Sequence, residues 1–222
     1  MSSAIKLEGV TVDFDGQIAL SNINLELNAK SVAVIGVNGS GKSTFARLLN
    51  GLVKPTAGTI TVDGNKPDVS NVGFVFSNPD LQIVMPTVYE DVAFSLTKQK
   101  LNKDEVRSRV EAALRMVGLF ELQESNCHTL SSGQKQLLAI ASSMVREPKV
   151  LVADEPTTLL DLPNTKLITG VLHKLNLGQL VLVTHDLELA ATCHEVVWFE
   201  KGLVRKVGKP KPVIAEYVSS FK

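Results

Sequence analysis

The hydrophobic positions of the chain follow two periods, and each predicts a different kind of element. The first 35 residues alternate, or run apolar with β-branched residues, in KLEGVTVDF, IALSNINLEL and SVAVIG. This pattern predicts two antiparallel strands that lead into a buried strand. A helical pattern then runs from Lys42 to Leu49, Gly51 ends it, and TITVDG and NVGFVF predict two more short strands.

The period changes in the middle of the chain. Three stretches predict helices, at Val88 to Leu96, Lys103 to Val117 and Ser132 to Arg146, without a convincing strand. Strands and helices then alternate again through VLVA, DLPNTKLITGVLHKLN, LVLV and EVVWFE, followed by the hairpin-like LVRKVG and a short helix. Because such alternation is typical of parallel sheets, we expect one domain, 1–222, with an α/β core at 1–85 and 148–222 and a helical subdomain at about 86–147.

Composition narrows the function classes. The 23 basic residues balance 23 acidic ones, so no surplus of positive charge favours a nucleic-acid partner. The apolar stretches are far shorter than the roughly 20 residues that span a bilayer. The start, MSSAIKLEG, lacks the features of a signal peptide, and Cys127 and Cys193 are isolated. We therefore expect a cytosolic protein whose two cysteines are free packing residues.

The segment GVNGSGKST matches the phosphate-binding pattern G-x-x-x-x-G-K-[ST], between a predicted strand and a predicted helix. Glycines let backbone N–H groups converge on phosphate oxygens, and the helix start adds a positive dipole end. Lys42 is expected to reach the β- and γ-phosphates and Ser43 to hold Mg²⁺, whereas a plain glycine-rich turn is the alternative. The expected nucleotide-binding residues are Gly36, Asn38, Gly39, Ser40, Gly41, Lys42, Ser43 and Thr44.

Two carboxylates follow the buried strand in KVLVADEPTTLLD. Asp154 and Glu155 stand at its carboxyl end, where ligands bind in open parallel sheets. Asp154 is expected to hold Mg²⁺, directly or through water. Glu155 is the candidate for polarising the attacking water, because it can face the γ-phosphate without ligating the metal. Two solvated acids at a strand end are the alternative.

A second anion site is predicted at LSSGQ, just before a helix. Ser131, Ser132 and Gly133 offer hydroxyl and N–H donors there. Serines at a helix start are usually only caps. The support for an anion site here therefore comes from the position of LSSGQ between the phosphate loop and Asp154.

The set Gly36 to Thr44, Leu130 to Gln134, Asp154-Glu155-Pro156, Thr158 to Asp161 and His185 resembles the ABC ATPase domain over essentially the whole chain. In that family these are Walker A, signature, Walker B, D-loop and switch histidine. The resemblance implies an α/β fold, a P-loop NTPase core whose mixed sheet has N-terminal antiparallel strands, with a helical signature subdomain. It also implies head-to-tail pairing with a second ATPase subunit, a copy or a paralogue, with each ATP between Walker A of one and the signature of the other.

The resemblance assigns further residues to the nucleotide. It implies that Phe14 stacks on adenine and that His185 contacts the γ-phosphate, with Glu155 as the other catalytic residue. A ring after a strand offers a stacking face, and a histidine at a strand end can donate to phosphate, although Phe14 could be core and a lone histidine structural. The signature and D-loop add Ser131, Ser132, Gly133, Gln134 and Asp161 to the nucleotide-binding set.

The segment Val75 to Leu96 resembles the corresponding region of energy-coupling-factor (ECF) importers of vitamins and of cobalt or nickel ions. Asn78 to Asp80, Gln82 and Thr87 to Phe94 carry this resemblance. It implies a transmembrane coupling subunit as partner and, through it, a substrate-binding membrane subunit. The chain is then an ATPase that energises import, peripheral at the cytoplasmic face of the cell membrane.

Two positions depart from that pattern. Ser77 stands where the family usually has a glutamine that links Mg²⁺ and water to the membrane partner, and serine is too short to do the same. Either Gln82 substitutes for it or the Mg²⁺ shell keeps an extra water. Leu137 stands where an arginine is common. A leucine at this position resembles the biotin-type subgroup, which favours biotin as the substrate.

Two other classes of function stay open. A soluble ABC ATPase of translation or DNA repair usually carries two ATPase domains, coiled-coil insertions or zinc-binding cysteine pairs, and none is visible. A P-loop kinase or GTPase leaves LSSGQ unexplained, and the chain lacks the guanine-reading Asn-Lys-x-Asp.

Overall fold

The computed structural model describes residues 4–158 and 160–221. Leu159, within the predicted D-loop, and the outermost residues of the predicted 1–222 domain lie outside the described residues. Contacts group the chain into two compact units. Unit 1 falls within Met1–Phe74, Lys149–Glu155 and Leu177–Lys222, and unit 2 within Val75–Pro148 and Pro156–Asn176. The predicted domain boundaries stay a prediction, and each unit is described by itself.

Unit 1 contains a three-stranded sheet in the order β2-β1-β4. Its strands are β1 (Ile5–Phe14), β2 (Gln17–Leu27) and β4 (Ala57–Val62), and β1 pairs antiparallel with both neighbours. Asp15 and Gly16 turn the chain between β1 and β2, each with a positive φ. The N-terminal antiparallel strands predicted from the alternation are confirmed.

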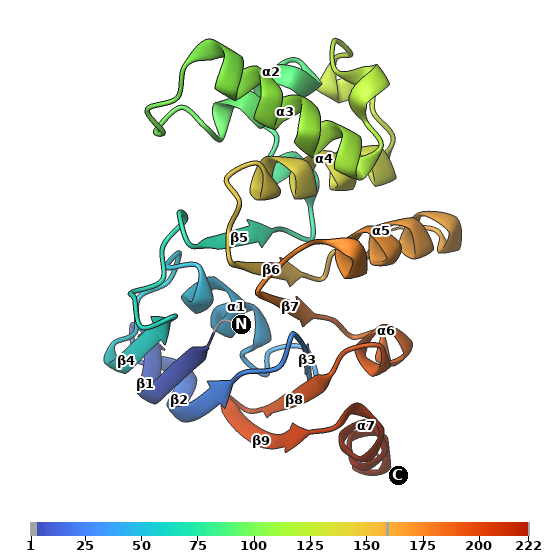
Figure 1. Cartoon of the computed structure of the whole chain (residues 1–222). Coiled ribbons are helices and arrows are strands. Elements are labelled where there is room, and N and C mark those ends of the chain that lie inside the picture. The colour runs from blue at the N-terminus through green and yellow to red at the C-terminus, as the bar shows by residue number, and fades with distance from the viewer. Residues whose placement is uncertain (1–3, 159, 222) are drawn as a thin grey trace. The chain divides into compact units, whose positions relative to one another are not determined.

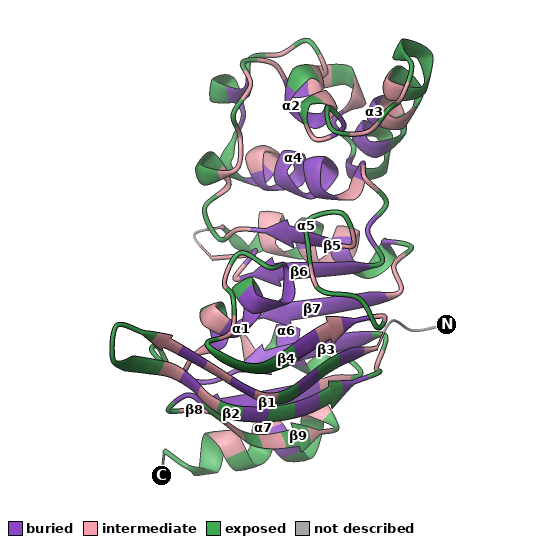
Figure 2. Cartoon of the chain, turned by 90° about the vertical axis from the view of Figure 1, so that its left-hand side faces the viewer, coloured by how far each residue is buried: buried purple, intermediate pink, exposed green. Residues whose placement is uncertain are grey.

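A six-stranded sheet has the order β5-β6-β7-β3-β8-β9. Its strands are β3 (Ser31–Ile35), β5 (Val72–Val75), β6 (Val150–Asp154), β7 (Gln179–Val183), β8 (Glu195–Glu200) and β9 (Leu203–Gly208). Parallel pairing joins β6 to β7, β7 to β3 and β3 to β8, while β9 runs antiparallel to β8. All residues of β3, β6 and β7 are buried, as Figure 2 shows, which explains their uninterrupted apolar runs. The mixed α/β fold is confirmed.

Figure 1 labels the helices, which are divided between the two units. Unit 1 has α1 (Lys42–Leu49), α6 (Leu187–Ala191) and α7 (Pro210–Ser219), and α1 packs on β6 and β7. Unit 2 has α2 (Val88–Phe94), α3 (Lys103–Val117), α4 (Ser132–Met144) and α5 (Leu162–Lys174), with single 3₁₀ turns η1 (Pro79–Leu81), η2 (Phe120–Leu122) and η3 (Cys127–Thr129).

Local capping explains several helix starts in unit 2. Thr87, Asn102 and Ser131 each precede a helix, and each forms a capping box with the residue three positions later. Gly118, with a φ of 76°, ends α3. The predicted helix starts at Val88, Lys103 and Ser132 are confirmed. The end of α3 is confirmed as well, whereas α2 and α4 end two residues earlier than predicted.

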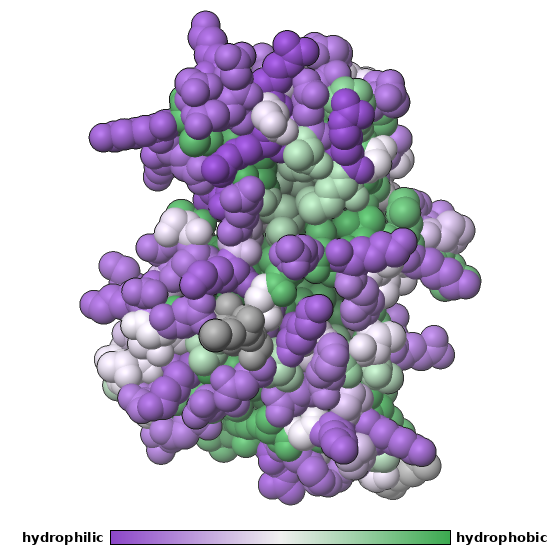
Figure 3. Space-filling view, viewed as in Figure 1, coloured by the Kyte–Doolittle hydropathy of each residue, from purple (hydrophilic) through white to green (hydrophobic). Residues whose placement is uncertain are grey.

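The surface is mostly hydrophilic on the face shown in Figure 3, with hydrophobic side chains in smaller patches. No helix in the described part of the chain is long and apolar enough to cross a membrane.

Candidate nucleotide-binding site

Three parallel strands of unit 1 end side by side at the candidate site. The register pairs Val34 of β3 with Val183 of β7, and Val183 with Asp154 of β6. The residues that follow these strands therefore meet at one sheet edge: the loop from Gly36, the pair Asp154 and Glu155, and His185. This is the edge at which ligands bind in open α/β sheets.

The loop between β3 and α1 needs glycine where the chain passes close to its neighbours. Gly36 has a φ of 149°, and a Cβ there would lie 2.3 Å from the carbonyl oxygen of Phe199. Gly41 has a φ of 104°, and a Cβ would lie 2.8 Å from the carbonyl oxygen of Ala19. Neither position can hold a larger residue without displacing backbone. Asn38 and Gly39 lie exposed at the tip of the loop.

Donors gather where this loop enters α1. Gly41 is the N-cap, so no side chain caps the first turn of the helix. The hydroxyl of Ser40 is buried without a hydrogen-bond partner in the described structure, and Thr44 lies in the first turn, partly buried. Free donors at a helix start favour an anion.

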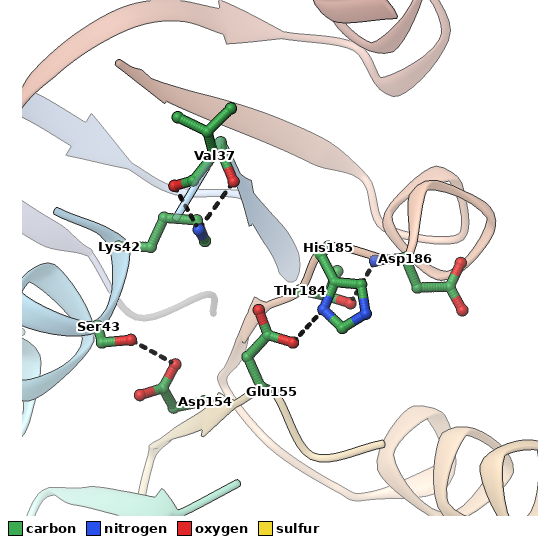
Figure 4. Close-up of polar contacts among 9 residues, drawn as sticks. Val37, Lys42, Ser43, Asp154, Glu155, Thr184, His185 and Asp186 are labelled. Carbon is green, nitrogen blue, oxygen red and sulfur yellow. Dashed lines mark hydrogen bonds and ion pairs between the residues drawn. The ribbon is translucent and has the colours of Figure 1, made fainter. Parts of the chain in front are cut away.

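Lys42 places a cation inside this loop (Figure 4). Its Nζ donates to the carbonyl oxygens of Gly36, at 2.8 Å, and Val37, at 3.0 Å, and the residue is only 6% exposed. Burial lowers the pKa of the Lys42 ammonium, although the nearby carboxylates of Glu155 and Asp154 act in the opposite direction. A phosphate could replace the carbonyls as acceptor and would add compensating charge.

Ser43 and Asp154 face each other across the edge. The Ser43 hydroxyl donates to Asp154 Oδ1 at 3.2 Å. Burial raises the pKa of the Asp154 carboxyl, against the hydrogen bond from Ser43 and the charge of Arg47. Two hard oxygen donors fit Mg²⁺, which takes few protein ligands and keeps waters and phosphate oxygens. Among the described residues no group of three or more His, Cys, Asp or Glu could hold a metal.

Glu155 and His185 form a second polar pair at the same edge. Glu155 Oε2 lies 2.5 Å from His185 Nδ1. The Glu155 side chain is 19% exposed and that of His185 is 67% exposed. A carboxylate only accepts, so Nδ1 carries the proton of this hydrogen bond. The pair turns a partly buried carboxylate toward the edge where Lys42 and Ser43 lie.

Unit 2 holds the LSSGQ segment at the start of α4. Ser131 Oγ accepts from the N–H of Gln134, and Gln134 Oε1 accepts from the N–H of Ser131. Both side chains therefore serve as caps, the role that serines usually have at a helix start. Ser132 is exposed and Gly133 is buried. The first turn of α4 contains no acidic residue, so the helix start stays compatible with an anion.

The family model for ABC transporters matches residues 20–158. The chain belongs to this family. A biotin transport ATP-binding protein, BioM, of Rhizobium etli is 40% identical over 96% of this chain and 97% of its own length. An energy-coupling factor transporter ATP-binding protein, EcfA1, of Symbiobacterium thermophilum is 42% identical over 90% of this chain and 74% of its own length. The structure of CbiO1 from Clostridium perfringens, described as part of an ABC transporter complex, matches with a TM-score of 0.88 and 36% identity, covering 98% of this chain and 92% of that one.

As an ABC transporter ATP-binding domain, the chain binds ATP, and Phe14 is placed in keeping with its predicted role. It ends β1 opposite Gln17, and its side chain is exposed in the hairpin rather than buried in the core. Adenine stacking stays a prediction for this residue.

Hydrogen bonds join the segment that follows β5 in this ABC domain to α4. Gln82 Nε2 donates to Ala139 O and Ser143 Oγ, and Gln82 Oε1 accepts from Phe76 N. Gln136 Nε2 donates to Phe76 O. The amide of Gln82 is thus committed within unit 2, which argues for a structural role rather than the proposed Mg²⁺ role. Ser77 lies exposed in the same segment.

The D-loop residue Asp161 caps α5 through Asn164, a residue that no motif in the sequence indicates. Asn164 donates to Asp161 Oδ1 through its backbone N–H and through Nδ2. The N-cap position of Asp161 is a sequence signal for the first bond. Nothing in the sequence signals that the Asn164 side chain also lies against Gly133.

Proposed function

We propose that this chain is the ATP-hydrolysing subunit of an ECF-type importer for a vitamin or for cobalt or nickel ions, with biotin as the favoured substrate. The similarity to BioM of R. etli and EcfA1 of S. thermophilum supports this proposal. Within the chain, support comes from Asn78 to Asp80, from Thr87 to Phe94 and from Leu137. The observation that carries most weight is the convergence of Lys42, Ser43, Asp154 and Glu155 at one sheet edge.

Nucleotide binding follows from the donors in the loop. The phosphates of ATP lie against the N–H groups at the start of α1, and Lys42 turns from the carbonyls of Gly36 and Val37 to phosphate oxygens. Ser43 and Asp154 would hold Mg²⁺, which would supply positive charge beside the phosphates.

Hydrolysis depends on the Glu155 and His185 pair. Glu155 accepts a proton from the attacking water at a carboxylate oxygen, while His185 Nδ1 holds the carboxylate in position. Because Nδ1 is occupied by this bond, contact between His185 and the γ-phosphate uses Nε2. Only the doubly protonated ring can donate through both nitrogens at once.

The nucleotide site is proposed to be completed by a second ATPase subunit, a copy of this chain or a paralogue. The partner would contribute its signature segment, and this chain's Ser132 and Gly133 would serve the partner's nucleotide in return. A transmembrane coupling subunit binds the pair and links it to a substrate-binding membrane subunit, at the cytoplasmic face of the cell membrane. Leu81 and Val84, which are 72% and 61% exposed, offer it an apolar surface.

Co-purification from native membranes tests this function. A tagged chain should bring down integral membrane subunits, identified by mass spectrometry, together with bound vitamin. Leu81→Asp should lose those subunits, whereas Leu203→Asp, at an exposed leucine of β9 in unit 1, should keep them. Recovery of ribosomes or DNA without membrane proteins would contradict the proposal.

A further inference from the structure

Asn164, in the first turn of α5, donates two hydrogen bonds to one carboxylate oxygen of Asp161. Its backbone N–H donates to Asp161 Oδ1 at 3.0 Å, and its Nδ2 donates to the same oxygen at 2.7 Å. The first bond is ordinary helix capping. The second bond also orients the Asn164 amide, with Nδ2 toward Asp161.

The other side of this amide faces the signature segment in the same unit. A Cβ built on Gly133 would lie 2.3 Å from Asn164 Oδ1 and 2.7 Å from its Cγ. Flipping the amide would bring its oxygen against the Asp161 carboxylate, where two acceptors repel. The oxygen therefore points toward Gly133, which is the second residue of α4 and is buried.

These contacts join the two segments through one side chain. A side chain at position 133 would displace the end of the Asn164 side chain, and this displacement would strain the Nδ2 bond to Asp161. A contact within this chain thus disfavours a larger residue at position 133, in addition to any nucleotide that approaches it. Position 133 and the cap of α5 are linked.

We propose that Asn164 is a positioning residue that links Asp161 to Gly133, so that the D-loop and the signature segment of one chain keep a constant relative geometry. The effect on hydrolysis rests on the proposed function, which places both segments against nucleotide. The contact itself does not depend on that function, so it can be tested separately.

A double-mutant cycle on the full chain tests the contact by thermal unfolding. Asn164→Ala should lower Tm by about 2–4 °C, because Asp161 loses a hydrogen-bond donor at the cap of α5. In Gly133→Ala the clash with the Asn164 amide opposes the gain in helix propensity, so the shift in Tm should be smaller. In the double variant the methyl group of residue 133 meets no amide, so its Tm should lie above the additive value. Additive Tm shifts would overturn the contact. Lys166→Ala, at an exposed residue of the same helix, is the matched control.

The hydrolysis rate of the native complex tests the positioning role. Asn164→Ala should lower kcat about tenfold at temperatures well below its Tm, with unchanged nucleotide affinity for the isolated chain. Asn164→Asp should be worse, because it sets a second carboxylate against Asp161, and Asn164→Ser should recover part of the rate through its hydroxyl donor. A wild-type kcat in Asn164→Ala would overturn the role, even if Tm falls. A wild-type complex without ATPase activity would instead contradict the proposed function. The double-mutant cycle in thermal unfolding would still test whether Asn164 contacts Gly133.

Discussion

Glu155 adopts a left-handed backbone conformation, with a φ of 55°, directly after β6. Such a conformation costs a non-glycine residue about 1–3 kcal/mol and persists only where its surroundings impose it. Here the N–H of Glu155 donates to Val183 O, and its side chain meets His185. Strain at this position is consistent with a carboxylate that is held for chemistry rather than left in solvent.

His185→Ala should lower the ATP hydrolysis rate about 100-fold, because the Glu155 carboxylate loses the hydrogen bond from His185 Nδ1 that orients it and the site loses a donor to phosphate. Nucleotide affinity should change little, since Lys42 and Ser43 are untouched. Phosphate release and fluorescent-nucleotide titration measure the two quantities. His128→Ala, an exposed histidine of unit 2, should match wild type, and a large loss of affinity in His185→Ala would contradict this division of roles.

Lys42→Ala should weaken ATP binding about 10- to 100-fold, the range expected when charge-assisted hydrogen bonds to phosphate are lost. Titration of the purified chain with a fluorescent ATP analogue measures the change. Lys30→Ala, which removes an exposed lysine at the other end of β3, is the control. Unchanged affinity in Lys42→Ala would remove Lys42 from phosphate binding.

At the scale of elements, Gln82 shows how one side chain attaches a segment that has only a short 3₁₀ turn. Gln82→Ala removes two hydrogen bonds that tie the segment after β5 to α4, and a third, from Phe76 N, within that segment. The free energy of unfolding should fall by about 1–3 kcal/mol. The Mg²⁺ concentration for half-maximal hydrolysis should stay unchanged, because the amide is committed to α4. A shift in that concentration without loss of stability would instead make Gln82 a metal ligand. Ser77→Ala, in the same exposed segment, is the matched comparison for both measurements.

Local signals made most elements predictable. Lys103 to Val117 is a helix with the expected bounds because Asn102 and Glu105 form its capping box and Gly118 ends it. The phosphate loop was predictable because its pattern and its flanking strand and helix are contiguous in sequence. The features that could not be predicted from the sequence depend on contacts between residues that are far apart in the chain. The pairing of β4 with β1 in a separate sheet joins residues about 50 positions apart, and neither the attachment of Gln82 to α4 nor the contact of Asn164 with Gly133 leaves a local pattern.

At the scale of the whole molecule, each unit contains one buried cysteine, Cys193 in unit 1 and Cys127 in unit 2. Burial raises the pKa of each thiol to about 11. At pH 8 the thiolate fraction is then only on the order of 0.1%, and access is blocked as well. Each thiol can therefore report the opening of its own unit.

The folded chain should react slowly with a thiol reagent at pH 8, and both cysteines should react at once after unfolding in denaturant. Single-cysteine variants, Cys127→Ala and Cys193→Ala, assign each reaction to a unit. Because the thiols ionise first in the unfolded chain, their contribution should also lower the free energy of unfolding as pH rises from about 9 to 11. Fast labelling of the native chain at pH 8 would contradict the burial of these residues.

ATP hydrolysis by the complex purified from native membranes, with Glu155→Gln beside wild type, tests the central claim most directly. The wild-type complex should release phosphate. The Glu155→Gln complex should contain the same subunits and bind ATP, yet hydrolyse it about 100- to 10,000-fold more slowly, because binding uses Lys42 and Ser43 while hydrolysis needs the base. Glu188→Gln, at an exposed glutamate of α6, should hydrolyse ATP at the wild-type rate. Hydrolysis at the wild-type rate in Glu155→Gln would contradict the account of this site.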